Sequence, residues 1–582
     1  MPYTHTYRQT FWILLAVCTL TIIPFLGLND FHTKGEPREA IVAYSMIEQG
    51  NWILPSNNGG DIPYKPPFFH WCIAAVSLLF NGGNVNEAMS RLPSALALIA
   101  MTMACFAFYA RRCGQETAAV TALVAFTTFE LHRAGMNCRV DMMLTSLTVI
   151  SLLCLYRWYE KGLHSIPWAA ILLMSCATLT KGPVGTIIPC LTIGIFLLTR
   201  GVGIFKAAGK LTAFAVMSLV LPMAWYIAAY NQGGKEFLDL AMDENFGRMY
   251  GTMRYESHVN PWYYNVMTVA AGYLPWTLLA VISLFTLRYK NLHKSQLSPG
   301  ILISGIREMS PVSMFSLVSI VTIFLFYCFP ESKRSVYLMP IYPFIAYFLA
   351  QYLFYLVNER SKSIKIYGGT LAAICILLPV TLILAKCGAI PDSIFKGRHA
   401  ALNAAMLHNI ADIRGVASMT IIAITTLPAA GWWIYARKRL GYRHIYAVII
   451  LTFGLYLSLD GVYQPAALNT KSVKEISADI DRQLPESEGT LYEFISDGVF
   501  SAGNPVHFFE INFYLGNRVG NFYKSRPESG FLLINDFDAK KYLPEFSREG
   551  YTFENVYKAP HDNPVHKTLE IYRFDKENAT PN

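Results

Sequence analysis

Charged residues are scarce in this chain. Only 15% of its 582 residues are Asp, Glu, Lys or Arg, whereas 53% are hydrophobic, and the mean hydropathy is +0.33. That composition lies outside the usual range of soluble globular domains. Apolar runs of about 17 to 22 residues, the length that crosses a bilayer core, recur from near Phe11 to near Leu459. The sequence therefore excludes an ordinary soluble protein and predicts a polytopic, all-α membrane protein.

Cysteine is absent from the last part of the chain. All eleven cysteines lie between Cys18 and Cys387, mostly within apolar runs, and their spacing fits neither a disulfide framework nor a metal knuckle. His258, His399 and His408 are scattered in loops, where solvated side chains explain them better than metal ligation. We predict no cofactor; a divalent cation would be compatible with the chemistry considered below, but no motif for it is visible.

Repeats, low-complexity tracts and a signal-peptide cleavage site are also absent. The first apolar run, from about Thr10 to Leu28, is therefore expected to be a retained signal anchor. A short run from about Phe68 to Phe80 follows two prolines and is expected to lie at the membrane interface. About thirteen spans remain, centred roughly on residues 19, 101, 124, 149, 173, 192, 220, 277, 320, 346, 376, 426 and 451.

Basic residues follow every second span. If the N-terminus is cytoplasmic, the inner loops carry Arg111, Arg112, Arg157, Lys161, Arg200, Lys206, Lys210, Arg288, Lys290, Lys294, Arg360, Lys362, Lys365, Arg437, Lys438, Arg439 and Arg443. This pattern obeys the positive-inside rule. The net charge of +9 thus reflects topology, and nucleic-acid binding is not needed to explain it.

Two domains are predicted, a transmembrane domain over residues 1–460 and a soluble α/β domain over 461–582. The odd number of spans places the second domain outside, with the long outer loops 29–90, 231–265 and 388–416. A short helix is expected from Glu36 to Met46. In the second domain we expect a helix over Ser472–Leu484 and strands over Thr490–Ile495, Val506–Phe513, Gly530–Asn535 and Thr568–Tyr572.

Polar residues that lie far apart in the sequence fall together on the outer side of this topology. They are Glu36, Lys65, Asp141, Lys181, Glu244, Arg248, Lys333, Arg334 and Tyr337. Lysine in a tight outer turn, as at Lys181, runs against the positive-inside bias. Cations at this depth indicate an anion, and carboxylates beside them indicate proton transfer or support of a developing charge. A phosphate-bearing lipid with its tail among the spans would explain both.

Each of these residues also has a simpler explanation. Asp141 starts an apolar span and could be an acid at a helix N-terminus, where the helix dipole favours it. Glu36 could begin an ordinary surface helix with Glu39 as a capping partner, and Lys65 could be a snorkelling interfacial lysine. Lys333 and Arg334 could simply pair with Glu331.

Several motifs in order resemble the bacterial polyprenyl-phosphate-dependent glycosyltransferases of the GT-C superfold. The chain is similar to the aminoarabinose transferases that modify lipid A and, more distantly, to the protein O-mannosyltransferases. The motifs are Gly35-Glu36-Pro37-Arg38, Tyr64-Lys65-Pro66-Pro67 with His70-Trp71, Arg91-Leu92-Pro93, Arg139-Val140-Asp141, Leu179-Thr180-Lys181-Gly182-Pro183 and Tyr337-Leu338-Met339-Pro340. Any one of them is weak, whereas the ordered set is specific.

The resemblance implies a thirteen-span GT-C fold, an undecaprenyl-phosphate-linked sugar donor and transfer with inversion on the periplasmic face of a Gram-negative inner membrane. It makes Glu36 and Asp141 the candidate catalytic acids. The candidate residues for binding donor phosphate or acceptor are Arg38, Tyr64, Lys65, Arg139, Lys181, Glu244, Arg248, Lys333, Arg334 and Tyr337. The acceptor would be lipid A or another envelope glycan or protein.

The chain departs from the family pattern at two positions. Gly35 stands where the first-loop motif usually has Asp, and Tyr64 stands where the lipid A enzymes typically have Glu, so aminoarabinose is not assumed as the donor sugar. A protein O-glycosyltransferase, a transporter or flippase, and an inactive lipid-binding homologue stay open as alternatives. Transport is disfavoured because no internal repeat is visible and the conspicuous charges gather at one surface.

Overall fold

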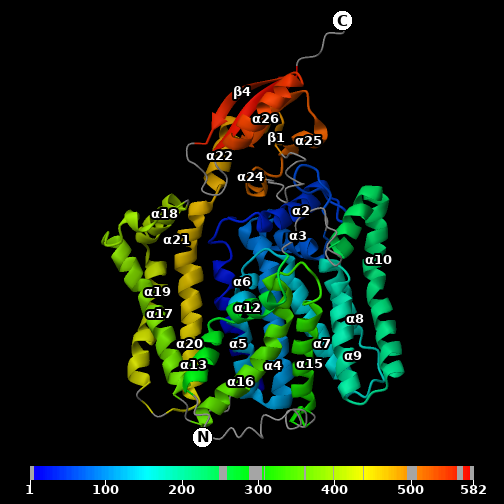
Figure 1. The fold of residues 1–582 in the computed structure, drawn as a ribbon, viewed down its shortest axis with the longest axis vertical. Coiled ribbons are helices and arrows are strands. Elements are labelled where there is room, and N and C mark those ends of the chain that lie inside the picture. Colours follow the sequence, from blue (N-terminus) through cyan, green and yellow to red (C-terminus); the bar gives the residue numbers. More distant parts are fainter. Residues whose placement is uncertain are drawn as a thin grey trace.

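The structure is a computed structural model that describes residues 6–63, 65–247, 259–286, 305–306, 308–359, 362–397, 399–436, 438, 440–494, 508–559 and 568–576. Figure 1 shows a bundle of long helices with a small sheet at one end, next to α24 and α2. The N-terminal end of α1 lies at the opposite end of the bundle. The division of the chain at residue 460 into two domains stays a prediction.

Helices dominate the first part of the chain. Its α-helices are α1 (Tyr7–Leu20), α2 (Gly35–Gln49), α3 (Phe68–Asn81), α4 (Glu87–Cys113), α5 (Gln115–Phe126), α6 (Phe129–Gly135), α7 (Val140–Glu160), α8 (Trp168–Lys181), α9 (Val184–Thr199), α10 (Ile204–Met242), α12 (Tyr263–Gly272), α13 (Trp276–Thr286), α15 (Pro311–Phe326), α16 (Tyr342–Asn358), α17 (Ser363–Lys386), α18 (Ala400–Ala411), α19 (Val416–Tyr435), α20 (Arg443–Ser458) and α21 (Gln464–Leu468). Short 3₁₀ or π turns are η1 (Ile23–Phe25), η2 (Asp243–Gly247), η4 (Ser335–Ile341), η5 (Asp392–Ile394), η6 (Leu459–Tyr463) and η7 (Asn469–Lys471).

Each of the predicted span centres falls within one of these helices. Among the described residues, eight helical segments are long and apolar enough to cross a membrane, and a ninth is added if α12 and α13, bent by 100°, form one broken span. The shorter apolar helices are α3, α8, α9 and α15. The chain is thus a multi-pass membrane protein, and the exact count of thirteen crossings stays a prediction.

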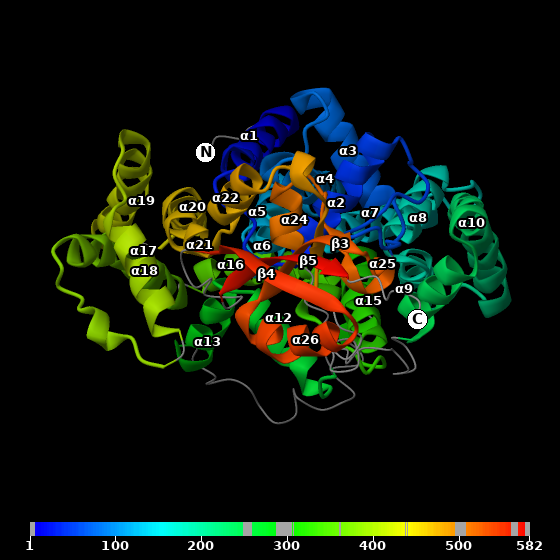
Figure 2. The same cartoon turned by 90° about the horizontal axis from the view of Figure 1, so that it is seen from above.

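The second part is a small α/β domain. It contains α22 (Lys474–Gln483), η8 (Glu486–Glu488), β1 (Leu491–Glu493), α24 (Phe509–Tyr514), β2 (Gly520–Asn521), α25 (Phe522–Ser525), β3 (Ser529–Asn535), α26 (Asp536–Arg548), β4 (Tyr551–Lys558) and β5 (Leu569–Lys576). The strand order is β2-β1-β3-β5-β4, with β1 parallel to β2 and β3 and the other pairs antiparallel. Seen from above, the sheet covers the central helices rather than the flanking α17–α19 or α8–α10 (Figure 2).

One predicted strand is wrong. The described part of Val506–Phe513 is the helix α24, not a strand. Phe508, Ile511 and Leu515 are all buried, and their spacing of three and four residues is that of one helix face. The helix α26 and the strand β4 were not predicted.

The segment from α2 to Gly59 packs against both the helical part and the C-terminal part of the chain. α2 contacts α3 and α4 in the membrane part and α24 in the C-terminal domain. A bridge between Gly59 and Gly520 adds the loop after α2 to the edge of the sheet at β2. Most of α2 is buried, although it is too short and too polar to be a span.

Candidate functional site

Two acids on α2 face different neighbours. Glu36 and Glu39 lie three residues apart near the start of the helix, and both are buried. Glu36 faces Arg91 of α4, whereas Glu39 faces Lys65 and His70 around the start of α3. The two carboxylates therefore belong to separate polar clusters, although they lie close together on the helix.

Glu36 is held by a buried arginine. The Arg91 guanidinium donates from Nε to Glu36 Oε1 at 2.8 Å and from Nη2 to Oε2 at 3.1 Å, and the backbone N–H of Cys138 donates to Oε1 at 2.9 Å. Arg91 Nη1 also donates to the carbonyls of Leu26 and Asn29. Burial acts to raise the pKa of Glu36, but Arg91 and the hydrogen bonds outweigh it and lower the pKa. Both carboxylate oxygens are used in joining α2, α4 and the start of α7.

Glu39 contacts two cationic side chains and a histidine. Its Oε1 accepts hydrogen bonds from Lys65 Nζ and, at 2.9 Å, from Arg38 Nη2, while its Oε2 lies 2.9 Å from His70 Nε2. Burial alone would raise the pKa of Glu39, but Lys65, Arg38 and His70 hold it well below its usual value. Burial lowers the pKa of Lys65 to about 8, although Glu39 acts to raise it.

Asp141, Lys181 and Tyr337 come together from three elements. Lys181 Nζ at the end of α8 donates to Oδ1 of Asp141 in the first turn of α7, and it lies 4.4 Å from the ring centre of Tyr337 in η4. α8 ends at Lys181 because Gly182 takes a φ of +83° and Pro183 follows. Across the described residues, Asp141 Oδ2 accepts no hydrogen bond, so this carboxylate keeps an oxygen for a ligand.

A cavity opens beside this trio. It is small, with a volume of about 10 Å³, and Asp141, Lys181 and Tyr337 supply its polar wall. The remaining lining is Leu144, Thr145, Thr148, Val184, Ile188, Tyr327, Val336 and Pro340. Lys65 interacts electrostatically with Asp141 as well as with Glu39, so the Glu39 cluster adjoins the same carboxylate. The arrangement offers an anion site next to a carboxylate, with an apolar wall leading away from both.

Arg139 lies directly over Gly35. A Cβ atom at position 35 would come within 2.1 Å of Arg139 Nη2, so the glycine makes room for the guanidinium. Within the described ranges, the Arg139 side chain makes no hydrogen bond or ion pair, although it interacts electrostatically with Asp141. The Arg139 guanidinium thus occupies the space beside position 35, where the family motif usually has an Asp side chain.

Glu244 lies in the π-helical turn η2, which continues α10. The next residue, Asn245, is seated against Gly182, because a Cβ there would come within 2.1 Å of Asn245 Oδ1. Asn245 Nδ2 is held by the carbonyl of Ala241 at 2.8 Å. The turn that carries Glu244 therefore packs against the end of α8 next to Lys181.

Lys333 and Arg334 precede η4. Lys333 is buried and donates from Nζ to the carbonyl of Pro330 at 2.7 Å. Arg334 Nε is buried and finds no hydrogen-bond partner in the described part of the chain. Lys333 therefore binds its own loop and takes no part in the cluster around Asp141. The predicted residues that do lie in neighbouring clusters are Arg38, Lys65, Arg139, Asp141, Lys181 and Tyr337. Tyr64 and Arg248 lie outside the described residues.

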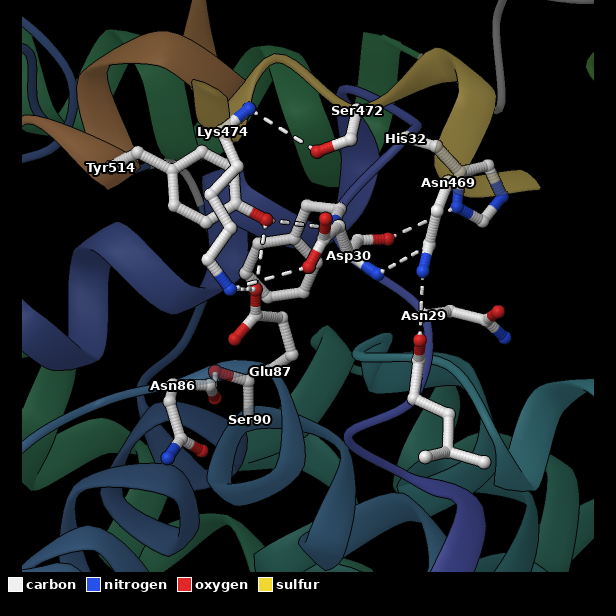
Figure 3. A network of polar contacts seen from close by, with 12 residues as sticks. Asn29, Asp30, His32, Asn86, Glu87, Ser90, Asn469, Ser472, Lys474 and Tyr514 are labelled. Carbon is white, nitrogen blue, oxygen red and sulfur yellow. Dashed lines mark hydrogen bonds and ion pairs between the residues drawn. The ribbon is translucent and has the colours of Figure 1, made fainter. Parts of the chain in front are cut away.

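A polar network joins the C-terminal part of the chain to residues 28–31 and to Glu87 at the start of α4 (Figure 3). Lys474 Nζ of α22 lies 3.3 Å from Asp30 Oδ1 and 3.2 Å from Glu87 Oε1, and Tyr514 OH donates to Glu87 at 2.8 Å. Tyr514 OH also accepts from the N–H of Phe31 at 2.9 Å. Asn469 donates to the carbonyl of Leu28 and accepts from the N–H of Asp30. We call these residues the Glu87 clasp; it fixes residues 28–31, directly beside the carbonyls that bind Arg91.

Comparison with known proteins places this geometry in context. A family model described as dolichyl-phosphate-mannose-protein mannosyltransferase matches residues 64–226. The crystal structure of ArnT from Cupriavidus metallidurans bound to undecaprenyl phosphate superposes with a TM-score of 0.66 at 19% identity, covering 97% of this chain and 98% of that one. The chain has the GT-C glycosyltransferase fold. The resemblance predicted from the sequence motifs is thereby confirmed.

Two relatives show sequence similarity to this chain, and one of them is named as a transferase. An undecaprenyl phosphate-alpha-4-amino-4-deoxy-L-arabinose arabinosyl transferase of Shewanella sediminis is 24% identical over 373 residues, which are 63% of this chain and 63% of that protein. An uncharacterized protein of Aquifex aeolicus is 28% identical over 361 residues, 60% of this chain and 64% of that protein. The similarity to each spans less than two thirds of the relative's length.

The sequence motifs did not predict Glu39 as a site residue, nor Arg91 as the partner of Glu36. Glu39 was read only as a capping partner, and His70 and Arg91 were noticed only as parts of motifs. A second acid three residues after Glu36 was the available signal, because residues i and i+3 share a helix side. Among the described residues, no group of three or more His, Cys, Asp or Glu side chains is placed to hold a metal ion.

Proposed function

We propose that this protein is an inner-membrane glycosyltransferase that moves a sugar from a polyprenyl-phosphate carrier to lipid A or another envelope acceptor, with inversion, on the periplasmic side. The observation that carries the proposal is the Asp141–Lys181–Tyr337 trio with Lys65 close by: a carboxylate with an available oxygen next to cations, at the mouth of an apolar cavity. The relatives named as arabinosyl transferases and the GT-C fold support it.

The chemistry assigns the carboxylates different tasks. In an inverting transfer the acceptor hydroxyl attacks the anomeric carbon, the bond from that carbon to the phosphate oxygen breaks, and the hydroxyl proton must leave. Asp141 is the carboxylate with an oxygen available to take or orient that proton. Glu36, whose oxygens are occupied by Arg91 and Cys138, would act by positioning the start of α7, on which Asp141 stands.

The departing lipid phosphate carries the negative charge that develops in the transition state. We assign the binding of this phosphate to the cations Lys65, Arg38 and Arg139, together with Tyr337. Tyr64 and Arg248, which lie outside the described residues, are further candidates. Preorganised donors aimed at such a charge are usually the largest catalytic contribution in a site shielded from water. Lys181 pairs with Asp141 and keeps that carboxylate ionised and oriented. Glu244 and Arg334 remain candidates for contacts to the acceptor.

Mass spectrometry of lipid A and total glycans tests the proposal in a deletion strain complemented with wild type, Asp141→Asn or Glu36→Gln. We expect deletion to remove one sugar, wild type to restore it and Asp141→Asn to fail while still reaching the membrane. An unchanged glycan profile after deletion would overturn the proposal.

A second candidate is a protein O-glycosyltransferase, favoured by the protein mannosyltransferase family that matches residues 64–226. Glycoproteomics on the same strains separates the two, because this alternative requires loss of peptide-linked sugar and an unchanged lipid A.

A further inference from the structure

A second charged cavity lies at the end of the bundle away from the C-terminal domain. It has a volume of about 350 Å³ and is lined by Arg111, Arg112, Arg157, Glu160 and Lys161. Arg111 and Arg112 end α4, whereas Glu87 at the start of that helix contacts Lys474 of the C-terminal domain. A helix of 27 residues is about 40 Å long, so this cavity lies a membrane thickness away from the Glu87 clasp. Asp141 and the cavity residue Glu160 also stand at opposite ends of the 21-residue helix α7, so the cavity does not belong to the Asp141 site.

The floor of the cavity is preorganised. Arg112 forms a two-pronged ion pair with Glu160, donates from Nη1 to the carbonyl of Phe108 at 2.6 Å, and lies 4.0 Å from the ring centre of Phe108. The Arg112 side chain is only 12% exposed. The one carboxylate in the cavity is thus already neutralised by the most buried of its cations.

Three cations remain around the rim. Arg111, Arg157 and Lys161 are exposed, and in the part of the chain that the structure describes their side chains make no hydrogen bond or ion pair. Three like charges facing one concave space repel one another, and a bound anion removes that repulsion. The positive-inside bias accounts for basic residues on this face, but it does not require three of them to converge on one cavity.

We propose that this cavity binds the phosphate headgroup of an anionic phospholipid. The ends of α4 and α7 place it at headgroup depth, and basic pockets between helices on this side of membrane proteins are suited to such headgroups. Guanidinium groups pair with phosphate oxygens in a two-pronged geometry, and Arg111 and Arg157 supply two of them. The acyl chains would lie along the lipid-facing sides of the same helices.

The test compares the purified protein in neutral detergent with two triple variants by native mass spectrometry. One removes the rim charges (Arg111→Gln, Arg157→Gln, Lys161→Gln) and leaves the Arg112–Glu160 pair intact. The matched control (Arg8→Gln, Lys206→Gln, Lys362→Gln) removes the same charge from exposed positions at or next to the starts of α1, α10 and α17, outside the cavity lining. The probes are cardiolipin, phosphatidylglycerol, phosphatidylethanolamine and inorganic phosphate.

We expect wild type and control to retain one or more anionic lipids, and the rim variant to bind them about 100-fold more weakly, from three lost contacts to an anionic headgroup. Equal loss in the rim and control variants would overturn the proposal in favour of diffuse surface attraction. Equal binding of inorganic phosphate would overturn the lipid assignment in favour of a small free anion. If the rim triple fails to elute as a folded protein, the single variant Arg157→Gln decides the question with the same probes.

Discussion

Asp141 has an oxygen available to a ligand, whereas both oxygens of Glu36 are bound within the protein. Their amide variants should therefore lose different properties, activity in the first case and stability in the second. Asp141→Asn keeps the shape of the side chain but removes the charge that pairs with Lys181 and the oxygen offered to the acceptor. We expect kcat to fall about 10²- to 10⁴-fold, the usual range for a lost proton-transfer group. Steady-state transfer assays in lipid measure this effect.

Glu36→Gln serves as the contrasting variant. It leaves the buried Arg91 guanidinium without its ionic partner, which typically costs about 3–5 kcal/mol of stability. We expect a clear fall in the thermal unfolding midpoint. If Glu36→Gln instead abolished turnover at unchanged stability while Asp141→Asn stayed active, our division of roles would be reversed.

Lys65 should give donor binding a pH dependence. Because its pKa is lowered to about 8, the ammonium is charged below that pH and progressively neutral above it, so kcat/KM for the donor should fall as the pH rises through about 8. Glu39 acts to raise this pKa, so Glu39→Gln should move the fall to lower pH. A pH profile of kcat/KM between pH 6 and 9 checks both statements. Lys65→Arg, which stays charged throughout, should abolish the fall; a shift to higher pH in Glu39→Gln would contradict the assignment.

At the scale of elements, the packing of α2 against the start of α7 depends on Gly35. Gly35→Ala would place a methyl group within 2.1 Å of the Arg139 guanidinium and force it to move. We expect weaker donor binding, seen as a raised KM. Gly203→Ala is the matched control, because nothing lies within 4 Å of a Cβ there and its φ is −58°. Equal KM values in the two variants would show that Arg139 does not contact the donor.

The Glu87 clasp is the second element-scale feature with a measurable effect. Tyr514→Phe removes the hydroxyl that bonds Glu87 and leaves the N–H of Phe31 without its acceptor. An unsatisfied buried group typically costs about 1–3 kcal/mol. We expect faster proteolytic release of the C-terminal domain from Tyr514→Phe. Tyr572→Phe, which loses hydrogen bonds to Glu570 and Asn555 within the sheet and none to the membrane part, is the control and should release the domain as slowly as wild type.

Elements were easier to predict from the sequence than side-chain partners. The span centres, the turn at Lys181 and the strands β3 and β5 follow from local hydropathy, turn residues and alternation. The partners of Glu36 and Glu39 depend on how α2 is rotated between α3 and α4, and no local pattern specifies that rotation. The segment Val506–Phe513 is predicted as a strand because Phe and Ile favour strands, whereas the tertiary contacts of Phe508 and Ile511 select a helix in its described part.

At the scale of the whole molecule, the orientation of the chain in the membrane is the prediction still to be tested. The proposal requires the C-terminal domain to be periplasmic and the N-terminus cytoplasmic. An alkaline phosphatase fused after Asn582 should therefore be active, and a green fluorescent protein fused there should be dark. The reverse pair of signals would place the Asp141 cavity in the cytoplasm and remove the periplasmic assignment. Fusions truncated after Lys161, on the basic face, are the internal control and should give the opposite pattern.

The Glu87 clasp also constrains how such proteins can be recombined. Asp30 and Phe31 bind the C-terminal domain, while Leu26 and Asn29 on the same stretch of backbone bind the arginine that holds Glu36. Exchanging the C-terminal domain with that of a relative therefore also alters the contacts that hold Arg91 and Glu36 in place. A functional chimera therefore has to take residues 26–31 and Glu87 from the same parent as residues 461–582, with crossover points before Leu26, after Glu87 and near residue 460.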